Sequence, residues 1–382
     1  MKIVYCVFDC SNFGGTERTL ALQANYFAER GHQVNIVTTE VPKFTEPYYH
    51  FSEKIRIFNL DVRYAEVDGS MSPVKIWRRI QKGRLHKQRL RTLVADLRPD
   101  ILVSLFSHEM AFLNDVKGDS ITIAQLHFSK QYRLIENRLL HKPLLSRWFT
   151  LLKEWRKKLH IHQYDAFVVL THEDAANWNL DNIHVIPNAL PFVPDSTSKR
   201  TAKRAISVGR LNVQKGYDQL LMAWRKVAEV HPDWELDIYG SGEERDHLMQ
   251  MVRDNSLEPY CHIHDAVSNI QEKYLESSFY VLSSLYEGFG IVLIEAMACG
   301  LPCVSYACPC GPSDIITDGE DGLLVPSGDV DRLADSICRI ISDREMRETM
   351  GQKAVSSVKR YSQEVVMNAW NDLFLKLLSG KK

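Results

Sequence analysis

The chain has 382 residues, too many for one ordinary hydrophobic core and enough for two domains of middling size. Its 45% apolar and 25% charged residues are typical of a globular protein and exclude a disordered or fibrous one. The formal net charge of −1 excludes a general nucleic-acid binder.

Short β-branched runs alternate with longer amphipathic stretches in the first half, which predicts strand–helix units around a parallel sheet. Thr16–Arg30 has apolar residues at helical spacing and stops at Gly31, so it is predicted to be a helix. The predicted strands of this half are Lys2–Phe8, Gln33–Thr38, Ile101–Leu105, Thr122–Leu126, Ala166–Leu170 and His184–Ile186. The first run ends at Asp9, too early for a signal peptide, and no apolar stretch is as long as a membrane span. We therefore expect a cytoplasmic protein with reduced cysteines.

The alternation is interrupted between residues 187 and 204, which are rich in proline, serine and threonine, and then starts again. We expect a first domain over 1–188, a linker over 189–204, a second domain over 205–361 and a helix over 362–382 that crosses back to the first domain. The predicted strands here are Ala205–Val208, Glu235–Tyr239, Tyr280–Leu282 and Pro302–Ser305, and the predicted helices are Gly216–Val230, Glu243–Asn255 and Ile291–Cys299. Two doubly wound α/β domains would bind ligands beyond the carboxyl ends of their strands.

The most informative motif is the segment from Glu287 to Glu295, in which two carboxylates lie on either side of a Gly-Phe-Gly turn. The helix predicted to begin at Ile291 would present free N–H groups and a positive dipole end, which suit a diphosphate. Glu295 would accept hydrogen bonds from neutral hydroxyls such as those of a ribose, and Glu287 would face the group attached to the phosphates. The segment therefore predicts a nucleotide site.

Two further loops are expected at the same site. Val208–Gly216 ends a strand and enters a helix, and it places Arg210 and Lys215 where fixed cations could meet the charges of a diphosphate. Gly14 and Gly15 follow the first strand and would let the backbone approach a ligand. Their order is not the Gly-x-Gly-x-x-Gly of dinucleotide enzymes, so a nicotinamide enzyme is disfavoured.

Polar residues after other strands give weaker signals. His127 follows a predicted strand and so reaches the cleft, and His108 and Glu109 are weaker candidates of the same kind. Cys308-Pro-Cys310 supplies two sulfur ligands without a second Cys or His pair, so no metal site is expected there.

The charge is distributed unevenly: residues 1–190 hold 26 basic and 20 acidic side chains, whereas residues 191–382 hold 21 and 28. Two basic stretches, 75–91 and 138–162, cause this excess and are interleaved with Trp and Leu. Such helices suit an anionic membrane surface, at about 1 kcal/mol per cation. A nucleic-acid patch and ordinary solvated helix faces are the alternatives. The side chains expected on this membrane and acceptor face are Lys75, Arg78, Arg79, Lys82, Trp148 and Arg156.

These motifs together resemble the retaining glycosyltransferases of the GT-B fold, specifically the large family 4 group that includes bacterial polysaccharide and lipopolysaccharide transferases. The resemblance covers nearly the whole chain and implies an acceptor-binding first domain and a donor-binding second domain. It implies catalytic roles for His127, Glu287, Arg210 and Lys215. The donor-binding residues that it implies are Gly14, Gly15, Gly209, Arg210, Lys215, Gly240, Glu287, Gly288, Phe289, Gly290, Ile291, Val292 and Glu295.

The activity that the resemblance implies is transfer of a hexose or N-acetylhexosamine from a nucleoside diphosphate sugar, UDP before GDP, to a growing lipid-linked or lipopolysaccharide glycan. The chain has no Asp-x-Asp triplet, so we expect neither a metal nor another cofactor. Ala307 stands where relatives often carry an aspartate, which removes any contact of that carboxylate. The anionic inner face of the cell membrane is the expected location, and no nucleic-acid partner is expected. A sugar-nucleotide epimerase of the same fold and a non-catalytic nucleotide-binding scaffold are the alternatives.

Overall fold

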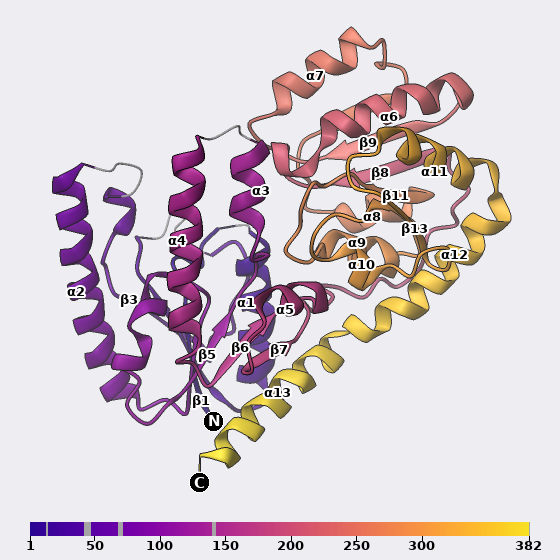
Figure 1. Cartoon of the computed structure of the whole chain (residues 1–382). Coiled ribbons are helices and arrows are strands. Elements are labelled where there is room, and N and C mark those ends of the chain that lie inside the picture. The colour runs from indigo at the N-terminus through magenta and orange to yellow at the C-terminus, as the bar shows by residue number, and fades with distance from the viewer. Residues whose placement is uncertain (13, 42–46, 68–71, 140–142, 382) are drawn as a thin grey trace.

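The computed structural model describes residues 1–12, 14–41, 47–67, 72–139 and 143–381, apart from the side chains of residues 144–149, 152 and 153. Over these residues the chain forms two α/β domains that lie side by side (Figure 1). Each domain contains one sheet in which all strands are parallel. The prediction of two doubly wound domains is confirmed.

The sheet of the N-terminal domain has seven strands among the described residues, in the order β3-β2-β1-β4-β5-β6-β7. Its strands are β1 (Lys2–Cys6), β2 (Gln33–Thr38), β3 (Arg56–Asn59), β4 (Ile101–Ser104), β5 (Ile121–Gln125), β6 (Ala166–Val169) and β7 (Ile183–Val185). The helices of this domain are α1 (Gly15–Glu29), α2 (Pro73–Leu97), α3 (Tyr132–Leu139), α4 (Leu144–Ile161) and α5 (His172–Trp178). The central strands are buried on both faces, as expected for a parallel sheet covered by helices.

The sheet of the C-terminal domain has six strands among the described residues, in the order β10-β9-β8-β11-β12-β13. Its strands are β8 (Arg204–Val208), β9 (Glu235–Tyr239), β10 (Cys261–His264), β11 (Phe279–Leu282), β12 (Cys303–Tyr306) and β13 (Gly322–Val325). The helices that follow are α6 (Tyr217–Val230), α7 (Arg245–Asp254), α8 (Ile270–Leu275), α9 (Ile291–Ala298), α10 (Pro312–Ile315), α11 (Val330–Ser342) and α12 (Arg344–Ser357).

The strand order reverses once in each sheet, and these two positions determine where a ligand can bind. In the first sheet β1 lies between β2 and β4, and in the second β8 lies between β9 and β11. Ligands of open α/β sheets bind at such switch points, beyond the carboxyl ends of the strands. The loops that leave β1, β8 and β11 there are the ones that carry the glycine and charged motifs of the sequence.

The last helix, α13 (Gln363–Gly380), leaves the C-terminal domain and packs on the N-terminal one. Figure 1 shows it running along one side of the molecule and ending near the N-terminus. Trp370 and Phe374 are buried in the same core as Phe27 of α1, and the rings of Phe27 and Phe374 lie 5.3 Å apart. The hydroxyl of Tyr26 donates to Asn368 at 3.4 Å. This helix therefore ties the end of the chain to the first core.

Edge strands are where the sequence prediction failed. The prediction missed β3, β10 and β13, which are three of the four edge strands of the two sheets. β3 is largely exposed and β10 alternates cysteine and isoleucine with two histidines, so neither has the continuous apolar run of a buried strand. Among the described residues, no helix is long and apolar enough to cross a membrane.

Candidate active site

The start of α9 is uncapped and is placed by glycines. Gly290 precedes the helix with a φ of 97°, a left-handed conformation that favours glycine, and no side chain caps the helix. A Cβ at Gly288 would lie 2.3 Å from the carbonyl oxygen of His127 in the other domain. The loop after β11 therefore touches the loop after β5, and only glycine allows this approach.

The start of α1 faces the start of α9 across the domain boundary. Gly14 precedes α1 in an extended conformation, again without a side-chain cap, and a Cβ at Gly15 would lie 3.6 Å from the Cδ1 atom of Ile291. Two helix N-termini with unpaired N–H groups thus come together, one from each domain. Both partial positive charges favour an anion between them.

Glu287 and Lys215, predicted from separate motifs, form a buried ion pair. The Nζ atom of Lys215 lies 2.7 Å from the Oε1 atom of Glu287, and the two side chains are 12% and 8% exposed. Ser284 donates its hydroxyl to the same carboxylate oxygen at 2.6 Å. The backbone N–H of Leu285 donates to the carbonyl of Gln214 at 2.8 Å, which joins the two loops. Glu287 is therefore held in place by the loop after β8.

Glu295 is also held, by residues that the sequence did not indicate. The Nη1 atom of Arg18, on α1, lies 2.5 Å from its Oε1 atom, and the hydroxyl of Tyr274 donates to its Oε2 atom at 3.0 Å. Burial raises the pKa of the Glu295 carboxyl, and the charge of Arg18 opposes that shift. The carboxylate predicted to meet a ribose thus already has one partner in each domain.

Arg210 is the exposed cation of the site. Its guanidinium makes no hydrogen bond or ion pair with the described residues. Burial raises the pKa of the nearby Glu17 carboxyl, and the charge of Arg210 opposes that shift. Arg210 is therefore available to an anionic ligand. Gly240, predicted to bind the donor, packs closely on the loop after β8, because a Cβ there would lie 1.9 Å from the carbonyl oxygen of Gly209.

His127 lies at the end of β5, and its ring is neutral at physiological pH. Burial lowers the pKa of this imidazole to about 4. Its Nε2 atom is buried and has no hydrogen-bond partner among the described residues. A buried polar atom without a partner is uncommon, and a ligand hydroxyl or carbonyl would satisfy it.

The weaker candidates contact residues of the N-terminal domain. His108 stacks on Tyr64 with ring centroids 3.7 Å apart, and Glu109 is buried with the hydroxyl of Ser104 on its Oε1 atom at 2.6 Å. Glu109 is buried, whereas His108 is half-buried. Cys308 and Cys310 are free cysteines, and both are buried.

The cations of the predicted basic face differ in how far their side chains are exposed. Lys82 donates to the carbonyl of Val62 at 2.6 Å and pairs with Glu66 at 2.9 Å, so its ammonium already has partners within the N-terminal domain. Arg78 and Arg156 are exposed, and Lys75 is partly exposed. Arg79 is exposed too. The side chain of Trp148 lies outside the described residues.

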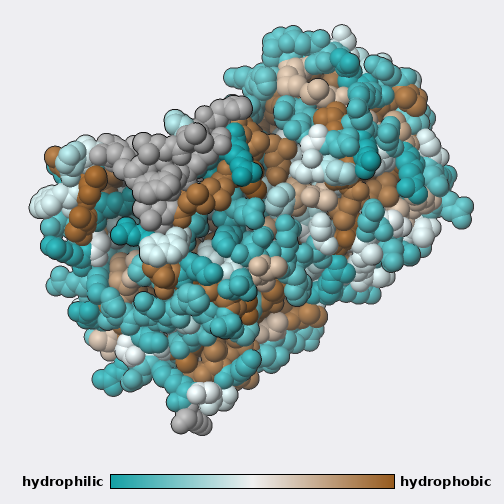
Figure 2. Space-filling model, viewed as in Figure 1, coloured by the Kyte–Doolittle hydropathy of each residue, from teal (hydrophilic) through white to brown (hydrophobic). Residues whose placement is uncertain are grey.

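The first half of α2 extends beyond the core of its domain. The buried residues of this helix, His86, Leu90 and Val94, all lie in its second half. In the first half Trp77 is 61% exposed and Ile80 is 52% exposed. Figure 2 shows hydrophobic side chains over the upper part of α2, the end at which this helix begins. This end lies on the side of the sheet where the strands end, because the helices run antiparallel to them.

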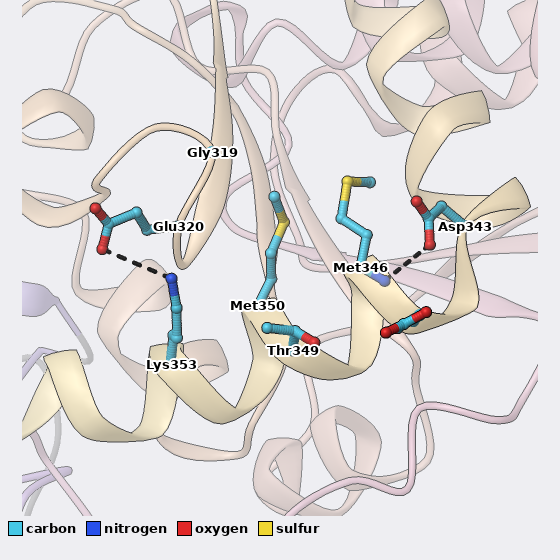
Figure 3. A pocket seen from close by; sticks show the side chains of 8 residues that line it. Gly319, Glu320, Asp343, Met346, Thr349, Met350 and Lys353 are labelled. Atoms are coloured by element: carbon cyan, nitrogen blue, oxygen red, sulfur yellow. Dashed lines mark hydrogen bonds and ion pairs between the residues drawn. The ribbon is translucent and has the colours of Figure 1, made fainter.

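A hollow on the C-terminal domain lies apart from this site (Figure 3). It is lined by Met346, Met350 and neighbouring residues of α12, with Gly319 and Glu320 from the loop before β13. Lys353 pairs with Glu320 across it at 3.9 Å. None of the residues predicted for the site lines it.

Two family models match the chain one after the other. The model of Glycosyltransferase Family 4 matches residues 13–191, and that of Glycosyl transferases group 1 matches residues 192–356. The chain belongs to the GT-B glycosyltransferases of family 4 type. The resemblance seen in the sequence is confirmed.

The relatives of this glycosyltransferase include bacterial enzymes of cell-surface polysaccharide biosynthesis. It is 28% identical to an uncharacterised glycosyltransferase of Haemophilus influenzae and 26% identical to the amylovoran biosynthesis glycosyltransferase AmsD of Erwinia amylovora, in each case over 97% of the chain and 99% of the relative. It is also 28% identical to an exopolysaccharide phosphotransferase of Streptomyces coelicolor over its whole length, and it spans 41% of that larger protein.

Solved structures confirm the GT-B fold. Sucrose-phosphate synthase from Thermosynechococcus elongatus matches with a TM-score of 0.80 and 17% identity over the whole of both chains. Anabaena HepE in complex with UDP matches with a TM-score of 0.75 and 16% identity, over 98% of this chain and all of the other.

Proposed function

We propose that this glycosyltransferase transfers a hexose or N-acetylhexosamine, with retention of configuration, from a nucleoside diphosphate sugar to a growing lipid-linked glycan. The observation that carries the proposal is the meeting of two uncapped helix starts with Lys215 and Arg210 at the facing switch points of the two sheets. A diphosphate matches this set of positive groups in charge.

The leaving group determines how these residues would act. When the bond to the anomeric carbon breaks, charge accumulates on the departing diphosphate, and the sugar becomes oxocarbenium-like. Arg210, Lys215 and the N–H groups at the start of α9 would stabilise that charge most strongly as it develops. Because fixed cations would supply this stabilisation, we propose a reaction that needs no metal.

The two carboxylates and His127 would bind the remainder of the donor. Glu295 would accept from the ribose hydroxyls and Glu287 from hydroxyls of the sugar. The Nε2 atom of His127, buried without a partner, would bond to the sugar that is transferred. The departing phosphate itself would take the proton of the acceptor hydroxyl on the same face of the sugar, so no protein nucleophile is required.

We propose UDP as the nucleotide, with GDP as the second choice. Several structures of the same fold were solved with UDP, among them Anabaena HepE with UDP and glucose and the pneumococcal O-GlcNAc transferase GtfA with UDP and GlcNAc. These neighbours support the donor class but are too distant in sequence to select the sugar.

We further propose that the acceptor is presented at an anionic membrane surface. The projecting first half of α2 supports this, since Trp77 and Ile80 are exposed beside Arg78 and Arg84. The relative that takes part in amylovoran biosynthesis supports a polysaccharide product.

The test is a thermal-shift panel of UDP-, GDP- and ADP-sugars, followed by transfer assays with lipid-linked acceptors. Two results together would support the proposal: thermal stabilisation by one donor, and a product whose glycosidic bond has the same anomeric configuration as that donor. Rapid formation of an epimer from donor alone would favour an epimerase instead. Donor binding without transfer to any lipid-linked acceptor would favour a scaffold.

A further inference from the structure

The Glu295 carboxylate is bonded from both domains at once. Arg18 approaches its Oε1 atom from α1, and Tyr274 donates to its Oε2 atom from α8. The side chain of Glu295 is 3% exposed, whereas that of Arg18 is 28% exposed and lies nearer the solvent. From this geometry we propose that Arg18 is a positioning residue of the donor site, which holds the ribose-binding carboxylate from the opposite domain.

Arg18 is part of the same helical turn as the Gly14–Gly15 loop. Its backbone N–H donates to the carbonyl of Gly14 at 3.1 Å and closes the first turn of α1. The helix start that would face the diphosphate and the residue that carries the guanidinium on Glu295 therefore belong to one helical turn. Binding of the phosphates at α1 and orientation of the Glu295 carboxylate are thereby connected.

Other bonds between the domains are of a different kind. The backbone N–H groups of His172 and Cys310 donate to the carboxylates of Asp314 and Glu173, at 2.5 and 2.8 Å, respectively. Among the described residues, Arg18–Glu295 is the ion pair of two side chains that joins the N-terminal and C-terminal domains. Separation of the domains would take the Arg18 cation away from Glu295.

The contacts of Glu295 leave acceptor sites on its carboxylate for the hydroxyls of a ribose. A carboxylate oxygen has two lone pairs, so Arg18 and Tyr274 use one on each oxygen and leave the others for hydroxyl donors. Arg18 would fix the rotamer of the carboxylate and keep it ionised, both of which strengthen a hydrogen bond from a neutral hydroxyl. The inference rests on the proposed function, because it assumes that Glu295 meets a ribose.

The test combines a change in the protein with a change in the ligand. Affinities for UDP and 2′,3′-dideoxy-UDP are measured by calorimetry for the wild type, R18Q and R30Q. Arg30 is an exposed arginine at the other end of α1, stacked over Tyr26 at 3.4 Å, and serves as the control. We expect the wild type and R30Q to bind the dideoxy ligand about tenfold more weakly than UDP, since bonds between hydroxyls and a carboxylate are lost. R18Q should bind UDP about tenfold more weakly than the wild type does, and its affinities for UDP and 2′,3′-dideoxy-UDP should differ less than threefold.

The possible outcomes distinguish the inference from the proposed function. Discrimination by R18Q as strong as that of the wild type overturns the role of Arg18 while leaving ribose binding intact. A wild type that binds both ligands equally, or neither, overturns the proposed donor site itself. R18K keeps the charge but not the planar fork, so it should recover part of the discrimination, and it supplies the same readout if R18Q does not fold. Discrimination by R18K no better than by R18Q overturns the charge-based mechanism.

Discussion

The buried pair of Lys215 and Glu287 allows stability and catalysis to be separated by substitution. Replacing Lys215 with methionine keeps most of the length of the side chain but leaves the Glu287 carboxylate buried without its cation. Loss of one partner from a buried pair costs about 3–5 kcal/mol. Because Ser284 still donates to the same oxygen at 2.6 Å, we expect the lower end of that range. A cost of about 3 kcal/mol lowers the unfolding midpoint of a domain of this size by about 6–12 °C.

The double variant K215M/E287Q removes both charges and retains an amide oxygen for Ser284. We expect it to regain at least half of the lost free energy of unfolding, because no uncompensated charge remains buried. Turnover should not recover. Loss of a cation from the diphosphate site reduces turnover on the order of 10²-fold, and the double variant lacks this cation too.

Thermal unfolding and sugar-transfer rates at saturating donor measure the two effects. Lys226→Met is the control, because Lys226 forms an exposed pair with Asp331, and such pairs contribute about 0–1 kcal/mol. If K215M retained turnover within threefold of the wild type, Lys215 would not stabilise the leaving group. If the double variant recovered its turnover, the loss of turnover in K215M would come only from the buried Glu287 carboxylate that has lost its cation.

Three further predictions concern pH, the membrane and metals. Burial lowers the pKa of His127 from 6.5 to about 4, so the folded protein binds fewer protons than the unfolded chain and loses stability as the pH falls from 6.5 to 4. His127→Asn should therefore lose less free energy of unfolding between pH 7 and pH 5 in urea titrations, and an equal loss would contradict the assignment. The triple variant Trp77→Ala/Arg78→Glu/Arg84→Glu should no longer sediment with phosphatidylglycerol vesicles. The control Arg225→Glu/Lys359→Glu, on the other domain, should stay bound. Unchanged sedimentation of the triple variant would exclude α2 as the membrane contact. Excess EDTA should leave the transfer rate unchanged. If EDTA abolished transfer and added Mg²⁺ or Mn²⁺ restored it, a reaction without metal would be ruled out.

The fold class and the loops of the site were predictable because their determinants are local. Buried parallel strands such as Ala166–Val169 are continuous apolar runs, and the glycines around Phe289 mark a turn whatever packs on it. The family 4 motifs are likewise contiguous in the chain. Edge strands such as β3 lacked this local signal and were missed.

The amino-acid sequence by itself determined the two α/β domains, the charged loops and the start of α9. Only the tertiary structure decided which of these groups are paired: Lys215 with Glu287, Lys82 with Glu66, and Glu295 with Arg18 and Tyr274. Arg18 and Glu295 are 277 positions apart, and their contact depends on how the domains pack. The physical reason is that charge pairing is set by distance in space and by burial, neither of which is recorded in the spacing of residues along the chain.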